Sequence, residues 1–264
     1  MRAQARLRHL GGWLASSADA LASVFLASGC RICDQPLTGA SRVPICADCL
    51  ASFEPVSRKI CDVCGVPLPT FEGSGNERRL CPLCRDKTYA FDHVRSFALY
   101  DRALVKAILL LKFERIDPLG AWFAERLTEL VGPEEERLRT DVVVPVPLHA
   151  VREKERGYNQ AALLAAPLAK KLKLPNQPTL LVRTRPRPDK RLLTLDQRWA
   201  SVRGAFATRP GTQVDNCRVL LVDDVLTTGA TLDACARALR DAGAKAIIGL
   251  TVARAIRDPD ARLR

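Results

Sequence analysis

The sequence has no uninterrupted apolar run of about 20 residues, the length that a membrane-spanning helix needs. We therefore expect no transmembrane span. Cysteine is too sparse for a disulfide scaffold, at 10 in 264 residues. Acidic residues are outnumbered by basic ones, 29 to 41, and the net charge of +12 suits an anionic partner without identifying one. The hydrophobic share of 47% excludes a disordered chain, and the length predicts one large domain or one domain with an appendage.

The cysteines are concentrated near the start of the chain. Eight of them precede residue 85 and form four Cys-x-x-Cys pairs. A two-residue gap places both thiolates on one tight knuckle, and two knuckles supply the four ligands of a structural zinc site. This repeated gap is typical of zinc ribbons and favours a reducing, cytoplasmic compartment over disulfides. The predicted ligands of two structural zinc ions are Cys30, Cys33, Cys46, Cys49, Cys61, Cys64, Cys81 and Cys84.

The spacing leaves the pairing of these knuckles open. Sequential pairing joins the first knuckle with the second and the third with the fourth, whereas a cross-braced arrangement joins the first with the third. A four-thiolate site has no open position for water or substrate, so in either case we expect each zinc to fold a module rather than to catalyse. Cys217 and Cys235 lie in apolar surroundings, which predicts core positions for both.

The N-terminal residues can be interpreted in two ways. Basic residues precede an apolar stretch that ends at Cys30, which resembles a lipoprotein signal with a lipidated cysteine. However, Asp19 interrupts the stretch and Cys30 already belongs to a Cys-x-x-Cys pair. Leucines and phenylalanine recur at three- to four-residue steps, so we expect an amphipathic helix over residues 1–29.

Beyond the last cysteine pair, apolar strands alternate with helical patterns. Strands are expected at 93–100, 141–148, 179–183, 218–222 and 246–253, and helices at 104–113, 119–131, 159–172 and 231–242. This alternation predicts an α/β fold with a doubly wound parallel sheet, whose binding crevice lies beyond the carboxyl ends of the strands. The predicted organisation is a helix at 1–29, a double zinc-ribbon module at 30–90 and an α/β domain at 91–264.

The most informative segment follows the expected strand at 218–222. Two adjacent acids, Asp223 and Asp224, precede a loop of small and hydroxyl residues that opens a helix. Backbone N–H groups and hydroxyls at a helix N-terminus bind phosphate, and glycine lets the backbone approach closely. Carboxylates beside a phosphate site require hydroxyls or a metal, which ribose and Mg²⁺ supply. The loop residues are Thr227, Thr228, Gly229, Ala230 and Thr231.

This segment resembles the phosphoribosyl pyrophosphate (PRPP) motif of type I phosphoribosyltransferases. The resemblance implies that Asp223 and Asp224 contact the ribose hydroxyls and associated Mg²⁺, and that the loop from Thr227 to Thr231 holds the 5′-phosphate. It also implies a type I phosphoribosyltransferase-like sheet for the domain at 91–264.

A second segment narrows the resemblance. Val144-Pro-Val-Pro-Leu-His149, then Arg152 and Arg156-Gly-Tyr-Asn-Gln160, is similar to the signature of the ComF family of competence-associated proteins, as are Leu111-Lys-Phe113 and Gly204-Ala-Phe206. That family combines a double zinc ribbon with a phosphoribosyltransferase-like domain. The resemblance implies a pyrophosphate-binding loop that includes Pro147, Leu148 and His149, assisted by Arg152 and Arg156. Tyr158 and Asn159 are alternatively a brace at a helix start.

The stretch from Arg183 to Arg203 carries seven basic residues against two acids. It departs from the ComF pattern because Lys190 and Ser201 stand where a Gln and an Asn are usual. In type I phosphoribosyltransferases a mobile loop in this region closes over PRPP, which makes Lys190 a candidate catalytic residue beside Asp223 and Asp224. The alternatives are a nucleic-acid contact, with Trp199 stacking on a base or packing in the core, and a solvated loop.

Two functions follow from the resemblance. The first is a PRPP-binding, Mg²⁺-dependent enzyme that transfers a phosphoribosyl group to an acceptor, for which the sequence contains no recognisable nucleobase pocket. The second is a non-catalytic module of DNA uptake in natural transformation, which binds single-stranded DNA or a protein of the competence machinery. ComF membership is compatible with both.

Overall fold

The computed structural model describes residues 29–37, 41–56, 59–68, 78–131, 140–186, 194–212 and 214–256. The helix expected at 1–29 lies outside this part of the chain except for Gly29, and so does Lys190. Among the described helices, none combines the length and the apolar character needed to cross a membrane.

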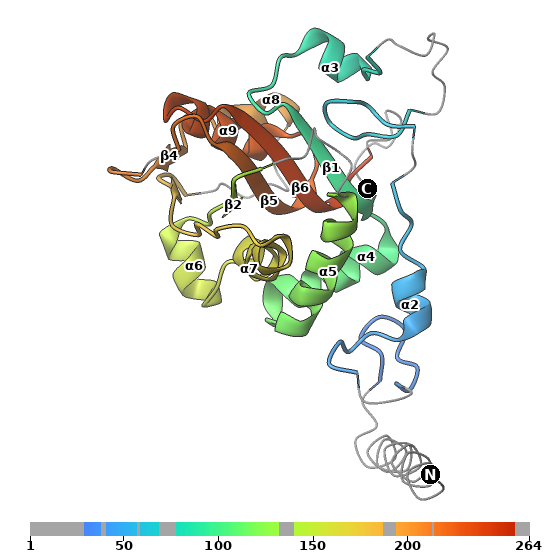
Figure 1. Ribbon diagram of the computed structural model, residues 1–264. Coiled ribbons are helices and arrows are strands. Elements are labelled where there is room, and N and C mark those ends of the chain that lie inside the picture. The colour runs from blue at the N-terminus through green and yellow to red at the C-terminus, as the bar shows by residue number, and fades with distance from the viewer. Residues whose placement is uncertain are drawn as a thin grey trace, which may run out of the picture.

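Four parallel strands form the central sheet, in the order β1-β6-β5-β2 (Figure 1). They are β1 (His93–Leu99), β2 (Val142–Pro145), β5 (Arg218–Leu226) and β6 (Ala246–Arg254). The central pair, β5 and β6, consists mostly of buried residues, as expected for a parallel sheet covered on both faces. The expected end of β5 at residue 222 is wrong, because the strand continues through both acids to Leu226.

Helices cover both faces of this sheet. On one face pack α4 (Arg102–Phe113), α5 (Asp117–Leu130) and α7 (Gln160–Leu172), and on the other packs α9 (Ala230–Asp241) (Figure 1). Side chains alternate between the faces along β5, so that Leu220 joins the core under α4, α5 and α7 while Leu221 joins the core under α9. The expected doubly wound architecture is therefore confirmed.

The strand expected at 179–183 forms but does not join the parallel sheet. It is β3 (Leu181–Arg183), which pairs antiparallel with β4 (Phe206–Thr208) in a separate two-stranded sheet. In the α/β domain two short helices were likewise not predicted, α6 (Ala150–Arg156) and α8 (Leu195–Ala200). Only six or seven residues long, they provide too few turns for a clear helical period.

The cysteine-rich region packs on the domain at two separate places. The first knuckle pair, which includes α2 (Ala47–Ala51), shares the core of α4 and α5. The second, with α3 (Pro82–Asp86), lies beside β1, whose Val94 N–H donates to the carbonyl of Val63 at 2.7 Å. Both modules are thus attached to the α/β domain through specific contacts.

Candidate functional site

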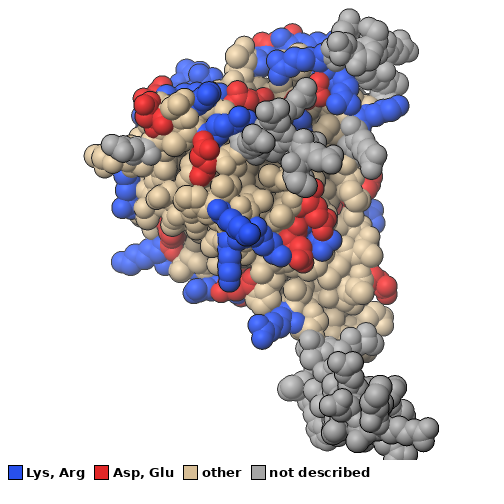
Figure 2. Space-filling model, viewed as in Figure 1, with Lys and Arg blue, Asp and Glu red and all other residues tan. Residues whose placement is uncertain are grey.

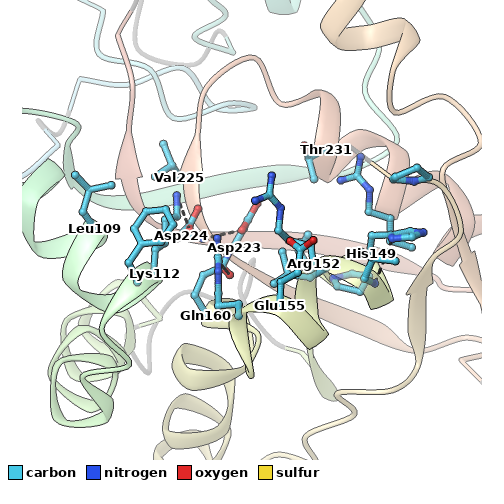
Figure 3. A pocket seen from close by; sticks show the side chains of 18 of the residues that line it. Leu109, Lys112, His149, Arg152, Glu155, Gln160, Asp223, Asp224, Val225 and Thr231 are labelled. Carbon is cyan, nitrogen blue, oxygen red and sulfur yellow. Dashed lines mark hydrogen bonds and ion pairs between the residues drawn. The ribbon is translucent and has the colours of Figure 1, made fainter. Parts of the chain in front are cut away.

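A cavity of about 740 Å³ opens beyond the carboxyl ends of β2 and β5, where the sequence predicts the binding crevice. Its walls come from α4, the loop after β2, α6, β3 and the segment that joins β5 to α9 (Figure 3). Nine of the predicted site residues line it: Pro147, Leu148, His149, Arg152, Arg156, Asp223, Asp224, Thr227 and Thr231. Segments far apart in the sequence therefore meet at one site.

The two acids occupy one wall of the cavity. They are neighbours in a strand, so their side chains leave the backbone on opposite sides. Asp223 is half-buried and accepts a hydrogen bond from the backbone N–H of Asp224 at 2.9 Å. The Asp224 side chain is almost wholly buried, and such a carboxylate requires a partner.

Lys112 is that partner. It lies on α4, and its ammonium nitrogen is 2.9 Å from an Asp224 carboxylate oxygen (Figure 3). The lysine side chain is 22% exposed, so both charges are largely withdrawn from water. In the sequence, Lys112 stands out only as part of the family signature Leu111-Lys-Phe113. Its pairing with Asp224 makes it an additional site residue.

The loop between β5 and α9 has the geometry of an anion cradle. Gly229 is the N-cap of α9 and has a φ of 80°. This left-handed backbone conformation is easily adopted by glycine and is unfavourable for residues with a side chain. The Thr228 hydroxyl accepts a hydrogen bond from the Ala230 N–H at 3.3 Å. The loop thus lies at the start of a twelve-residue helix, whose dipole favours negative charge.

The wall formed by α6 carries two arginines and one acid, Glu155, and is braced from behind. His149 is the N-cap of α6, which carries Arg152 and Arg156. Asn159 caps α7 and donates a hydrogen bond to the Val146 carbonyl at 3.0 Å, which fixes the loop before His149. The Tyr158 hydroxyl donates to the Leu111 carbonyl and accepts from the Arg115 N–H. The expected brace at this helix start is therefore present.

Arg183, on β3, is a third arginine that lines the cavity. Its residue is 8% exposed, and burial lowers the pKa of its guanidinium below the ordinary value. Nε donates to the Arg185 carbonyl, but within the described part of the chain no group hydrogen-bonds Nη2. Burial likewise lowers the pKa of Arg156, which also lines the cavity. Both cations would therefore gain from an anionic ligand.

The cysteines form two compact four-sulfur clusters with sequential pairing. One contains Cys30, Cys33, Cys46 and Cys49, the other Cys61, Cys64, Cys81 and Cys84, and within each cluster the ligand atoms lie within 4.8 Å of one another. A tetrahedral zinc with bonds of about 2.3 Å sets its sulfurs about 3.8 Å apart.

Individual distances match that requirement. Cys33 and Cys46 Sγ are 3.7 Å apart, and Cys64 and Cys81 Sγ are 3.6 Å apart. The Cys46 N–H lies 3.3 Å from Cys30 Sγ, and the Cys81 N–H lies 3.4 Å from Cys61 Sγ, as hydrogen-bond donors to thiolates. Both sites therefore fit zinc. Cys235 packs in the α9 core as expected, and burial raises its pKa, whereas Cys217 is only partly buried and packs against that core.

The described residues of the basic stretch from Arg183 to Arg203 lie in different environments. Arg183 is part of the cavity, whereas Arg203 is exposed. Trp199 lies 5.9 Å from the ring of Tyr89, and the ammonium of Lys87 sits 2.9 Å from the Trp199 ring centre. Of the two roles expected for Trp199, packing is thus the observed one.

Comparison with known proteins supports this organisation. The family described as "Double zinc ribbon domain" matches residues 21–85, and that described as "Phosphoribosyl transferase domain" matches residues 159–262. Together with the parallel sheet and the cysteine clusters, these matches confirm the predicted type I phosphoribosyltransferase-like fold preceded by a double zinc ribbon.

Relatives extend the match over most of the chain. "Competence protein F" of Haemophilus influenzae is 28% identical over 80% of this chain and 96% of its own length. "DNA utilization protein YhgH" of Salmonella typhi is 30% identical over 83% of this chain and 93% of its own. Among solved structures, glutamine PRPP amidotransferase from B. subtilis matches 50% of this chain and 26% of its own at 22% identity and a TM-score of 0.34.

Proposed function

The chain belongs to the ComF family of competence and DNA utilization proteins, and on that basis we propose that its cavity binds PRPP with Mg²⁺ and transfers the phosphoribosyl group. The role that we propose in the cell is DNA uptake during natural transformation, from the cytoplasm. We also propose the division into residues 1–29, 30–90 and 91–264 as its functional organisation.

One observation carries the proposal, namely the convergence of two acids, a hydroxyl-rich helix start and a basic loop around a single cavity. Each part suits one portion of PRPP. The acids suit the ribose hydroxyls, the segment from Thr227 to Thr231 suits the 5′-phosphate, and the wall with His149, Arg152 and Arg156 suits the pyrophosphate. These parts come from separate segments that line one cavity, and PRPP likewise carries a phosphate at one end and a pyrophosphate at the other.

The acids also suit a hard cation. Mg²⁺ prefers oxygen ligands and is usually held by one or two carboxylates together with substrate phosphates. Asp223 and Asp224 provide such oxygens beside the cavity, and Lys112 offsets part of their charge. When bound, Mg²⁺ would neutralise charge on the leaving pyrophosphate.

The chain's own residues would contribute binding and charge compensation. In the reaction that the family resemblance implies, the C1–pyrophosphate bond of PRPP breaks through an oxocarbenium-like state and the acceptor then bonds to C1. The carboxylates of Asp223 and Asp224 lie where they can orient the ribose and favour the developing positive charge. The half-buried guanidinium of Arg156 and the buried guanidinium of Arg183 favour the departing pyrophosphate.

Calorimetry tests the binding step. Full-length protein should bind PRPP in the presence of Mg²⁺, and Asp223→Asn combined with Asp224→Asn should abolish binding while the protein stays folded. A pyrophosphate-release screen with nucleobases and small amines would identify the acceptor. Failure of the wild type to bind PRPP would refute the proposal, and binding without pyrophosphate release from any acceptor would favour a sensor over an enzyme.

A second candidate is a non-catalytic module that binds single-stranded DNA or a competence protein. The names of the relatives and the basic stretch favour it. On the face shown in Figure 2, however, basic side chains stand in separate groups with acidic ones between them. A salt-dependent mobility shift with a labelled single strand would support this candidate, and its absence at low salt would eliminate direct DNA binding.

A further inference from the structure

Arg254 connects the second cysteine cluster with the loop at the end of β5. It is the last residue of β6 and is 6% exposed. Its Nη2 donates to Cys64 Sγ at 3.6 Å. Its Nη1 faces the carbonyls of Leu226 at 3.1 Å and Thr227 at 2.7 Å. One planar guanidinium therefore contacts a predicted zinc ligand and the backbone from which the phosphate loop starts.

A second set of contacts connects the same two regions. The Tyr89 hydroxyl donates to the Thr228 carbonyl at 3.5 Å, and the Tyr89 ring stacks on Phe91 at 4.6 Å. Both rings lie against Gly229, where an added Cβ would come within 3.2 Å of Tyr89. The Ala90 N–H donates to the Asp233 carboxylate at 2.7 Å, in the first turn of α9. The segment after the last cysteine thus covers the phosphate loop.

The Arg254 contact would depend on zinc, because the ion gathers the four sulfurs of the second cluster around one point. Four thiolates around one Zn²⁺ carry a net charge of two minus, and hydrogen bonds from a cation to a thiolate are charge-assisted. Without zinc nothing would hold the four sulfurs around one point, so Cys64 Sγ would leave its place beside the guanidinium. Arg254 would then lose the interaction that holds it over the two carbonyls.

The contact has a geometric consequence for the loop. Fixing the carbonyls of Leu226 and Thr227 on one side of the backbone directs the following N–H groups of the loop to the opposite side, where an anion can bind. We propose that Arg254 is a positioning residue through which the second zinc site holds the loop from Thr227 to Thr231 in its phosphate-binding conformation. This inference rests on the proposed function in assigning the 5′-phosphate to that loop.

The first zinc site has different neighbours. Lys106 on α4 donates to the carbonyl of Ile32 at 2.8 Å, and Arg31 pairs with Glu114 just after α4. We therefore expect the dependence of the loop on zinc to be much stronger for the second site than for the first.

Two compounds that each resemble one part of PRPP distinguish a local effect on the phosphate loop from a general loss of stability. Ribose 5-phosphate probes the loop from Thr227 to Thr231, and inorganic pyrophosphate probes the wall with His149. In full-length zinc-loaded protein, Arg254→Met should weaken ribose 5-phosphate binding about tenfold, the typical effect of losing hydrogen bonds to a charged group. Pyrophosphate binding should change less than about twofold.

Arg95→Met is the matched control. Arg95, on β1, also connects the second zinc module to the sheet, because its guanidinium donates to the Asp62 carbonyl at 3.2 Å. It should leave the affinity for both probes unchanged. Arg254→Lys keeps the charge but not the planar guanidinium, so it should retain part of the affinity for ribose 5-phosphate. If Arg254→Met does not fold, Arg254→Lys is the variant to test.

Hydrogen exchange supplies a readout that needs no ligand. Arg254→Met, or replacement of Cys81 and Cys84 by serine, should speed amide exchange in the peptide from Leu226 to Asp233, and replacement of Cys46 and Cys49 should not. Unchanged exchange in Arg254→Met, or an equal rise with Arg95→Met, would overturn the coupling whether or not PRPP binds. If wild-type protein binds neither PRPP nor ribose 5-phosphate, the proposed function fails, and the exchange comparison still decides on the coupling.

Discussion

The ammonium of Lys112 lies 2.9 Å from the Asp224 carboxylate. This ion pair joins α4 to the acids of β5 at the cavity. Asp224 is only 5% exposed. A carboxylate at that depth requires a compensating charge, and a second carboxylate, Asp223, precedes it directly. The lysine therefore makes an acidic pair compatible with an anionic ligand before any metal binds.

Removing that lysine should destabilise the fold and impair the site. We expect Lys112→Met to lower the free energy of unfolding by about 1–3 kcal/mol, because it leaves a buried carboxylate unpaired. Denaturant titration measures this. Lys171→Met removes an exposed ion pair with Glu125 and should cost less than about 1 kcal/mol.

A double variant isolates the pairing. Lys112→Met combined with Asp224→Asn removes both charges, so it should be less destabilised than the sum of the two single variants. Simple additivity would show that the ion pair contributes little and that Lys112 acts through its packing alone.

The pairing of the zinc ligands has a stoichiometric consequence. Full-length protein should contain two zinc ions, and replacing Cys30, Cys33, Cys46 and Cys49 together by serine should leave one, because the other cluster keeps all four ligands. Metal analysis measures this. In a cross-braced arrangement the same variant would break both sites, so a zinc content near zero would contradict sequential pairing.

What the sequence predicts well is local. The segment from β5 through α9 combines an apolar strand, a glycine turn and a helix that are adjacent in the chain. The structure extends the strand past Asp224 and moves the helix by one residue. Each of the four cysteine knuckles is also formed by residues that are close in the sequence, so the knuckles could be predicted. Their pairing joins distant residues and could not.

What the sequence could not predict depends on contacts between distant segments. Lys112 meets Asp224 only because α4 packs under β5, and Arg254 meets Cys64 only because the second zinc module lies beside β6. The family signature at Leu111-Lys-Phe113 is a signal that could have found Lys112. Arg254 ends an apolar strand, and its neighbours in the sequence give no sign of a partner.

Gly229 should be intolerant of a side chain for two separable reasons. Its φ of 80° costs an L-residue about 1–2 kcal/mol, and a Cβ would press on Tyr89. Gly211 has φ of 78° and nothing within 4 Å of its Cβ position. Gly211→Ala should therefore show the backbone cost alone, and Gly229→Ala should be less stable than Gly211→Ala by denaturant titration and should also lose ribose 5-phosphate affinity. Equal stabilities and intact affinity would mean that the loop tolerates the contact with Tyr89.

Arg183 should contribute to pyrophosphate affinity although it lies outside the predicted pyrophosphate-binding loop. Its buried Nη2 has no hydrogen-bond partner within the described part of the chain, and burial lowers its pKa, so an anion in the cavity would relieve both costs. We expect Arg183→Met to weaken pyrophosphate binding about tenfold or more by calorimetry. Arg185→Met, which removes an exposed guanidinium two residues away, should change the affinity less than about twofold. If the two variants weaken binding equally, the basic stretch acts through its overall charge and Arg183 has no specific place in the site.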